Sequence, residues 1–168
     1  MNRTKDYNII KYLNSIKGGC QMFLDGILSP YTPCKKYPLG NSVSGYLGYI
    51  DTEPFYIPPS FSDVKTDPKL SSLRPKFVLL SAPGAAGKSS LAKYIAHRFD
   101  ALYWNLAKVK VGTNSFAGSI LNAVGSSKYS EFIADLNVGN VLLVIDALDE
   151  AEIISGRKML NCFIEDIS

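Results

Sequence analysis

Lys88 and Ser89 are the residues whose types and spacing most clearly allow chemistry, because they directly follow a loop that contains Gly84 and Gly87. The glycines permit backbone angles and close approaches that a side chain would prevent. Successive backbone N–H groups of such a loop, together with the positive end of a following helix, bind phosphate groups. Lys88 would then reach the β- and γ-phosphates, and the Ser89 hydroxyl would bind Mg²⁺. The spacing therefore predicts a binding loop for a nucleoside triphosphate.

The elements on either side of this loop agree with that prediction. The apolar run 77–80 has no helical period and predicts a buried strand, while residues 88–99 predict a helix with one apolar face. Ala82 stands where the strict pattern has its first glycine, a difference of one methyl group. The alternative is a chance Gly-Lys-Ser after an apolar strand. We predict that the nucleotide is bound by Ala82, Pro83, Gly84, Ala85, Ala86, Gly87, Lys88, Ser89 and Ser90.

A second group of chemically capable residues follows the apolar run 141–145, which predicts another buried strand. Asp146, Asp149 and Glu150 would then lie at the carboxyl end of a parallel strand, where α/β sheets bind ligands. Asp146 would hold the Mg²⁺ shell. Glu150 is the first candidate to orient or deprotonate an attacking water, and Asp149 is the second. The alternative is that these acidic residues only favour the dipole of a helix that starts here.

The rest of the C-terminal half alternates strands with helices, which predicts a parallel α/β sheet. Thr113, Asn114 and Ser115 offer caps for one of the helices. Beyond the elements already named, we expect a strand at 101–106 and helices at 116–124, 129–136 and 153–167, the last of them unbroken.

The N-terminal part carries no chemistry of its own. We expect residues 1–74 to form a helical or extended region with a linker, and residues 75–168 to form the nucleotide-binding domain. A helical stripe at 6–17 predicts a helix whose apolar face packs on the protein or binds a partner. Residues 46–57 are rich in Tyr, Phe and Ile, but Pro54 and the prolines after it predict an edge strand or an extended arm.

Length and composition limit the functional classes. A chain of 168 residues is long enough for one domain with its own core. Its net charge of +3 is too small to predict binding to nucleic acid or to an anionic membrane. Because no segment resembles a secretory signal or reaches the length of a membrane span, we expect a cytoplasmic protein. The three cysteines lack paired metal-ligand spacing and predict reduced thiols rather than disulfides or a zinc site.

The segments 82–89 and 141–151 together resemble the STAND class of P-loop NTPases and, within it, the NACHT group. In these proteins a small residue follows the Mg²⁺-binding aspartate, and further acidic residues come two or three positions later. Ala147, Asp149 and Glu150 occupy those places in this chain. Members of the class are usually large signalling switches, including immune receptors and bacterial defence proteins.

The resemblance covers residues 76–155 and implies a P-loop NTPase three-layer parallel sheet with a small irregular N-terminal extension. It also implies that ATP and Mg²⁺ bind, and that the intact protein hydrolyses ATP and self-associates. Only 22 residues follow Asp146, so the family's later strands, sensor residue and repeat regions have no counterpart. We therefore expect a C-terminally incomplete sheet in an N-terminal fragment that is inactive alone. In the family a later strand separates the strands expected here at 77–80 and 141–145.

Two other functions stay open on the sequence. A small P-loop kinase can be this short, but its lid normally carries several arginines. The arginines of this chain are scattered, at Arg3, Arg74, Arg98 and Arg157. A non-hydrolysing assembly module would keep the same loop and use the nucleotide only as a structural ligand.

Overall fold

The computed structural model describes residues 34–40, 46–54 and 86–167. The chain divides into two compact units, one made of residues 1–30 and 57–88 and the other of residues 31–56 and 89–168. Most described residues belong to the second unit, whereas only residues 86–88 belong to the first. The domain boundary predicted at residue 74, the helix predicted at 6–17 and the strand predicted at 77–80 lie outside the described residues.

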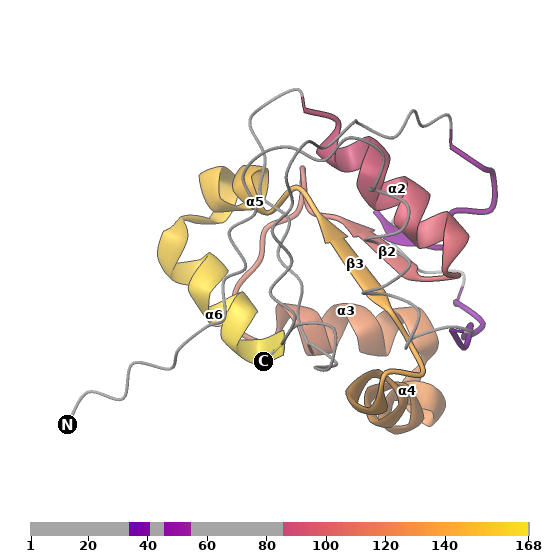
Figure 1. Ribbon diagram of the computed structural model, residues 1–168. Coiled ribbons are helices and arrows are strands. Elements are labelled where there is room, and N and C mark those ends of the chain that lie inside the picture. The colour runs from indigo at the N-terminus through magenta and orange to yellow at the C-terminus, as the bar shows by residue number, and fades with distance from the viewer. Residues whose placement is uncertain (1–33, 41–45, 55–85, 168) are drawn as a thin grey trace, which may run out of the picture. The chain divides into compact units, whose positions relative to one another are not determined.

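The described part of the chain contains a three-stranded mixed sheet with the order β1-β2-β3 (Figure 1). The strands are β1 (Leu47–Gly48), β2 (Leu102–Asn105) and β3 (Leu143–Asp146). β2 and β3 run parallel, with Leu102 opposite Leu143 and Asn105 opposite Asp146. β1 pairs with the other side of β2 in the antiparallel direction. The parallel pair agrees with the alternation of strands and helices in the sequence.

β1 confirms the edge strand that was predicted within residues 46–57. Because β1 lies on the far side of β2, this segment does not fill a position beside β3. The buried strand predicted at 141–145 is confirmed in part: Val141 is buried, and Leu143, Val144 and Ile145 are half-buried and pack against the apolar clusters.

Five helices accompany the sheet in the described residues, and they are α2 (Lys88–Arg98), α3 (Ser115–Val124), α4 (Ser126–Val138), α5 (Leu148–Ser155) and α6 (Arg157–Ile167). The helices predicted at 88–99, 116–124 and 129–136 are confirmed by α2, α3 and α4. The prediction of one unbroken helix at 153–167 was wrong. Gly156 separates α5 from α6 with a φ of 81°, a backbone angle that ends a helix.

The start of α3 also differs from the prediction. Asn114 precedes the helix in a left-handed conformation, and its side chain makes no capping hydrogen bond. Instead its backbone N–H donates to the carboxylate of Asp166, which comes from α6. The Ser115 hydroxyl accepts a hydrogen bond from the Gly112 backbone N–H at 2.9 Å. The side chain of Asn114 therefore does not cap α3 as expected, and the Asp166 carboxylate binds the backbone just before the helix.

The two faces of the sheet carry separate apolar clusters. Leu102 and Trp104 belong to the larger cluster, which includes residues of α3, α4 and α6. Trp104 contacts Phe163 of α6 in an edge-to-face arrangement, with ring centroids 5.5 Å apart. Tyr103 points to the opposite face and packs with Ala96 of α2. Since successive side chains of a strand alternate between faces, helices cover both sides of β2.

Residues 34–40, which precede β1, are attached to the second unit by polar and aromatic contacts. The Tyr37 hydroxyl donates to the Asp135 carboxylate at 2.5 Å, and the Tyr37 ring packs edge-to-face on Phe132. Lys35 forms ion pairs with Glu131 and Asp135 of α4. The segment is thus part of the same core as the C-terminal helices.

Two further observations concern the described residues alone. Cys34 and Cys162 are not part of a disulfide. None of the helices found there is both long enough and apolar enough to cross a membrane.

Candidate functional site

The N-terminal end of α2 lies at the carboxyl edge of the sheet. α2 packs through Ala92 and Ala96 on the sheet face that carries Tyr103. Residues 99–101 connect the end of α2 directly to the start of β2, so the helix runs antiparallel to the strand that it covers. A helix of this length spans about 16 Å and a four-residue strand about 13 Å. Ser89 therefore lies near the level at which β2 and β3 end, as Figure 1 shows for the first turn of α2.

Asp146 is the last residue of β3 and reaches the same edge. It is buried, with 8% of its surface exposed, and the other charged residues among those described are more exposed than this. Its Oδ2 accepts a hydrogen bond from the Tyr103 hydroxyl at 2.8 Å, and its Oδ1 accepts one from the Ala147 backbone N–H at 2.9 Å. A carboxylate that is removed from water needs such donors. Burial and the hydrogen bond to Asp146 raise the pKa of Tyr103 well above its usual range, so its hydroxyl keeps the proton that it donates.

Ala147 turns the chain sharply between β3 and α5. It adopts a left-handed conformation, with φ 64° and ψ 41°, which costs roughly 1–2 kcal/mol for a residue with a side chain. This turn places the Ala147 N–H on the carboxylate of Asp146. Such strained residues often occur at functional sites. A small residue is favoured here because a bulkier side chain would increase the strain.

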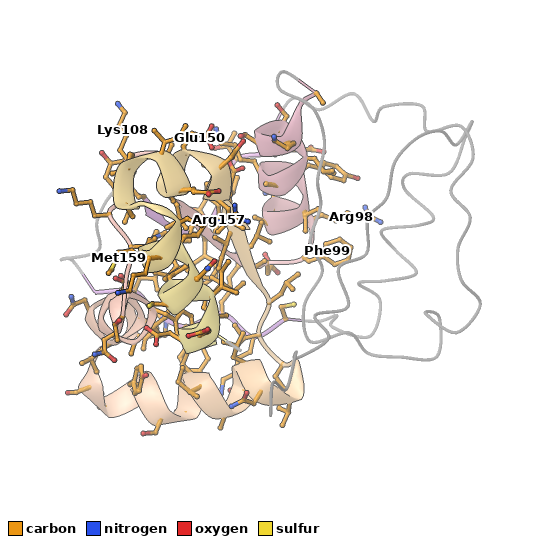
Figure 2. All side chains as sticks on the ribbon, turned by 90° about the vertical axis from the view of Figure 1, so that its left-hand side faces the viewer. Arg98, Phe99, Lys108, Glu150, Arg157 and Met159 are labelled. Carbon is orange, nitrogen blue, oxygen red and sulfur yellow. The ribbon has the colours of Figure 1, made fainter. Side chains whose placement is uncertain are left out.

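Asp149 and Glu150 lie in the first turn of α5 and are exposed, unlike Asp146. A hydrogen bond with Asp149 raises the pKa of Glu150, and the negative charges of Asp149 and Asp146 raise it further. In Figure 2, Glu150 on α5 and the first turn of α2 both lie in the upper part of the view. Arg98, at the other end of α2, lies lower. Two carboxylates with a shared hydrogen bond can exchange a proton with water, and they also favour the helix dipole.

The predicted phosphate-binding residues are only partly described. Ala82, Pro83, Gly84 and Ala85 lie outside the described residues. Gly87 has a φ of 80°, and a Cβ placed on it would meet no atom within 4 Å, so this position needs glycine for its backbone angle and not for lack of space. Ala86 and Gly87 are exposed, Lys88 is half-buried, and Ser89 and Ser90 are exposed in the first turn of α2.

The site's donors suit a magnesium ion that is carried by a nucleotide. In the part of the chain that the structure describes, no group of three or more His, Cys, Asp and Glu side chains could hold a metal by itself. Magnesium bound to a nucleotide keeps water and phosphate ligands and takes few from the protein. An ionised carboxylate offers about four acceptor positions, and Tyr103 and Ala147 use two of those on Asp146. Asp146 and the hydroxyl of Ser89 therefore offer the kind of oxygen ligand that such an ion takes from a protein.

Sequence reasoning missed Tyr103. A tyrosine inside a predicted strand is ordinary, and nothing near it in the sequence indicates a partner 43 residues away. The register of β2 against β3 makes the contact possible, because Tyr103 lies opposite Val144 and therefore on the same face as Asp146.

Comparison of the chain with protein-family models, with curated proteins and with solved structures gave no significant match. A function for the site must therefore be argued from the residues of this chain.

Proposed function

We propose that this chain is a Mg-ATP-binding P-loop NTPase module of a signalling or defence switch protein. The observation that carries the proposal is the position of Asp146. It is a buried carboxylate at the carboxyl end of a parallel strand, and its two bound partners are both hydrogen-bond donors. The same sheet edge holds the first turn of α2, which continues the Gly-Lys-Ser sequence. A hydroxyl and backbone N–H groups at a helix start, together with a carboxylate at a strand end, suit phosphate and Mg²⁺.

Each residue has one role in this proposal. Lys88 and the backbone of residues 82–90 bind the phosphates, and Ser89 and Asp146 hold the Mg²⁺ shell. Glu150 accepts a proton from the attacking water, with Asp149 as the other candidate for this role. When bound, Mg-ATP supplies the γ-phosphoryl group that is transferred to water. In the intact protein, nucleotide binding would accompany self-association.

The test is ATP binding by the Lys88→Ala variant of the full-length protein, measured by calorimetry in the presence of Mg²⁺. Loss of a charge-assisted contact to the phosphates should weaken binding at least tenfold, which corresponds to about 1.4 kcal/mol or more. Lys93→Ala is the matched control, because Lys93 is an exposed lysine later in α2. Its affinity should equal that of the parent protein. Equal affinities for the parent and Lys88→Ala would disprove the phosphate-binding loop.

A second candidate function is supported by one observation. Asp149 and Glu150 lie in the first turn of α5, where acidic side chains stabilise a helix without any catalytic role. A nucleotide-binding assembly module that does not hydrolyse ATP would show the same arrangement. One measurement distinguishes the two functions. An NTPase hydrolyses ATP and loses this hydrolysis, but keeps ATP binding, when these carboxylates are replaced. The assembly module binds ATP without hydrolysing it, so the replacement changes nothing.

A further inference from the structure

We propose that Tyr103 is a positioning residue for Asp146: its hydroxyl fixes the carboxylate in the orientation that the Mg²⁺ of a bound nucleotide requires. The inference rests on the proposed function and extends it to a residue on a neighbouring strand. Tyr103 would touch neither nucleotide nor metal and would act only through Asp146.

The backbone geometry brings the two side chains together. β2 and β3 are parallel, with Tyr103 opposite Val144 and Asn105 opposite Asp146. Side chains two residues apart on a strand share a face, so Tyr103 and Asp146 are diagonal neighbours on one face of the sheet. The tyrosine is long enough to reach the end of the neighbouring strand, and the distance from its hydroxyl oxygen to Oδ2 is 2.8 Å.

The surroundings hold the tyrosine in place. Tyr103 has only 6% of its surface exposed and packs with Ala96 and Ala101, with Leu142 and Val144 beside them. An aromatic ring confined in this way cannot easily withdraw its hydroxyl from the carboxylate. The hydroxyl therefore provides a fixed donor, and the hydrogen bond needs no rearrangement when a ligand arrives.

The carboxylate of Asp146 is held at both oxygens. The Ala147 N–H donates to Oδ1 from within the chain, and Tyr103 donates to Oδ2 from β2. Two donors in different directions prevent rotation of the carboxylate about its last bond. If only Ala147 remained, the carboxylate could turn toward water, and its free oxygen would no longer have a fixed direction.

The experiment compares nucleotide affinity with and without Mg²⁺ for the full-length parent protein and for Tyr103→Phe, which keeps the ring and removes the hydroxyl. The ratio of the affinity with Mg²⁺ to the affinity without it should fall roughly three- to tenfold in the variant, the size expected for the loss of one ordinary hydrogen bond. Affinity measured in EDTA should change less than about twofold, since phosphate contacts do not involve Tyr103. Tyr129→Phe, on α4, is the control and should leave both affinities unchanged.

A double-mutant comparison tests whether Tyr103 acts on Mg²⁺-dependent binding through Asp146. Asp146→Asn alone should reduce the Mg²⁺-dependent ratio, and adding Tyr103→Phe to it should reduce the ratio no further, because residues that act through one contact are not additive. The fluorescence of Trp104, the single tryptophan of the chain and the neighbour of Tyr103, reports whether β2 keeps its packing in each variant.

Three results would overturn the inference. A parent that binds Mg-ATP and a Tyr103→Phe variant with the same Mg²⁺-dependent ratio would reject the role of Tyr103 and leave the proposed function intact. Equal weakening with and without Mg²⁺ would show that Tyr103 only supports the fold. A parent protein that binds no ATP would reject the proposed function, and the role of Tyr103 with it.

Discussion

The three carboxylates at the end of β3 and just after it differ in what surrounds them. Asp146 is buried and hydrogen-bonded by two donors, whereas Asp149 and Glu150 are exposed in the first turn of α5. A buried carboxylate without donors would cost several kcal/mol, so the contacts of Asp146 are required by its position. Glu150 instead has a raised pKa because it shares a hydrogen bond with Asp149. Under the proposed function, the buried Asp146 would hold the Mg²⁺ shell and the exposed Glu150 would accept a proton from water.

The pair Asp149 and Glu150 gives a pH-dependent prediction under the proposed function. A carboxyl with a raised pKa becomes fully ionised, and able to accept a proton, only at higher pH. Asp149→Asn removes the neighbouring negative charge, so the acidic limb of the ATP hydrolysis profile should move to lower pH. Glu150→Gln should keep ATP binding and reduce hydrolysis by roughly 10² or more. The measurement is the hydrolysis rate of the full-length protein from about pH 4 to about pH 9, a range that starts near the ordinary pKa of a glutamate and extends past neutral pH.

The two variants also decide which carboxylate accepts the proton. A large loss of hydrolysis in Asp149→Asn, with Glu150→Gln near the parent rate, would reverse the assignment. Parent rates in both variants would remove the catalytic role of this pair and favour the non-hydrolysing module.

At the scale of elements, Gly156 determines the path of the C-terminal part. It has φ 81° and ψ 150°, a combination that residues with a side chain rarely adopt. The resulting break lets α6 contact α3 through the core, with Leu160 and Phe163 both buried. An unbroken helix would continue along the axis of α5 and would not bring Leu160 and Phe163 into the core.

Gly156→Ala should therefore destabilise the protein by about 1–3 kcal/mol, the typical cost of such a backbone conformation for alanine. Space is not the cause, because a Cβ on Gly156 would meet no atom within 4 Å. Gly118 is the matched control: it lies inside α3, and a Cβ there also meets no atom within 4 Å. Gly118→Ala should stabilise by about 0.5–1 kcal/mol because alanine favours a helix. Urea unfolding followed by circular dichroism measures both, and a neutral Gly156→Ala would contradict this account.

At the scale of the whole molecule, segments that precede the predicted nucleotide-binding domain belong to its core. β1 covers the edge of β2, Leu47 is buried, and His97 of α2 donates from Nδ1 to the Ile50 carbonyl at 2.9 Å. Tyr37 is buried against Phe132 of α4. The second compact unit accordingly includes residues 31–56. These contacts attach residues 34–40 and 46–54 to the helices and strands that follow residue 88.

A chain that starts at residue 75 should therefore fail to keep the packing of the second unit. It lacks Leu47, whose burial contributes about 2 kcal/mol, and leaves the edge of β2 open to pairing with other molecules. We expect red-shifted fluorescence of Trp104 and aggregation on size-exclusion chromatography. A chain that starts at residue 31 is the control, since it keeps Tyr37 and β1. Cooperative unfolding of the shorter chain, with the stability of the control, would show that residues 31–74 are dispensable.

The sequence by itself determined the local features of this protein. Apolar runs and turn residues located α2, β2, α4 and the edge strand at residues 46–57, because secondary structure follows from residue type and period. The same reasoning placed Asp146 at the end of its strand, since an apolar run that stops at a carboxylate marks a strand end. The start of α2 after Gly87 also follows from the sequence, where the glycine is needed for its positive φ.

Only the tertiary structure decided which distant residues meet. The hydrogen bond from Tyr103 to Asp146 depends on the register of two strands whose partners are 43 positions apart, and the bond from Tyr37 to Asp135 joins residues 98 positions apart. The contact of Asp166 with the backbone N–H of Asn114, 52 positions apart, arises for the same reason. Such contacts are set by how elements pack, and packing depends on the whole chain, whereas residue type and period act over a few neighbours. The donors that hold Asp146 could therefore be found only in three dimensions.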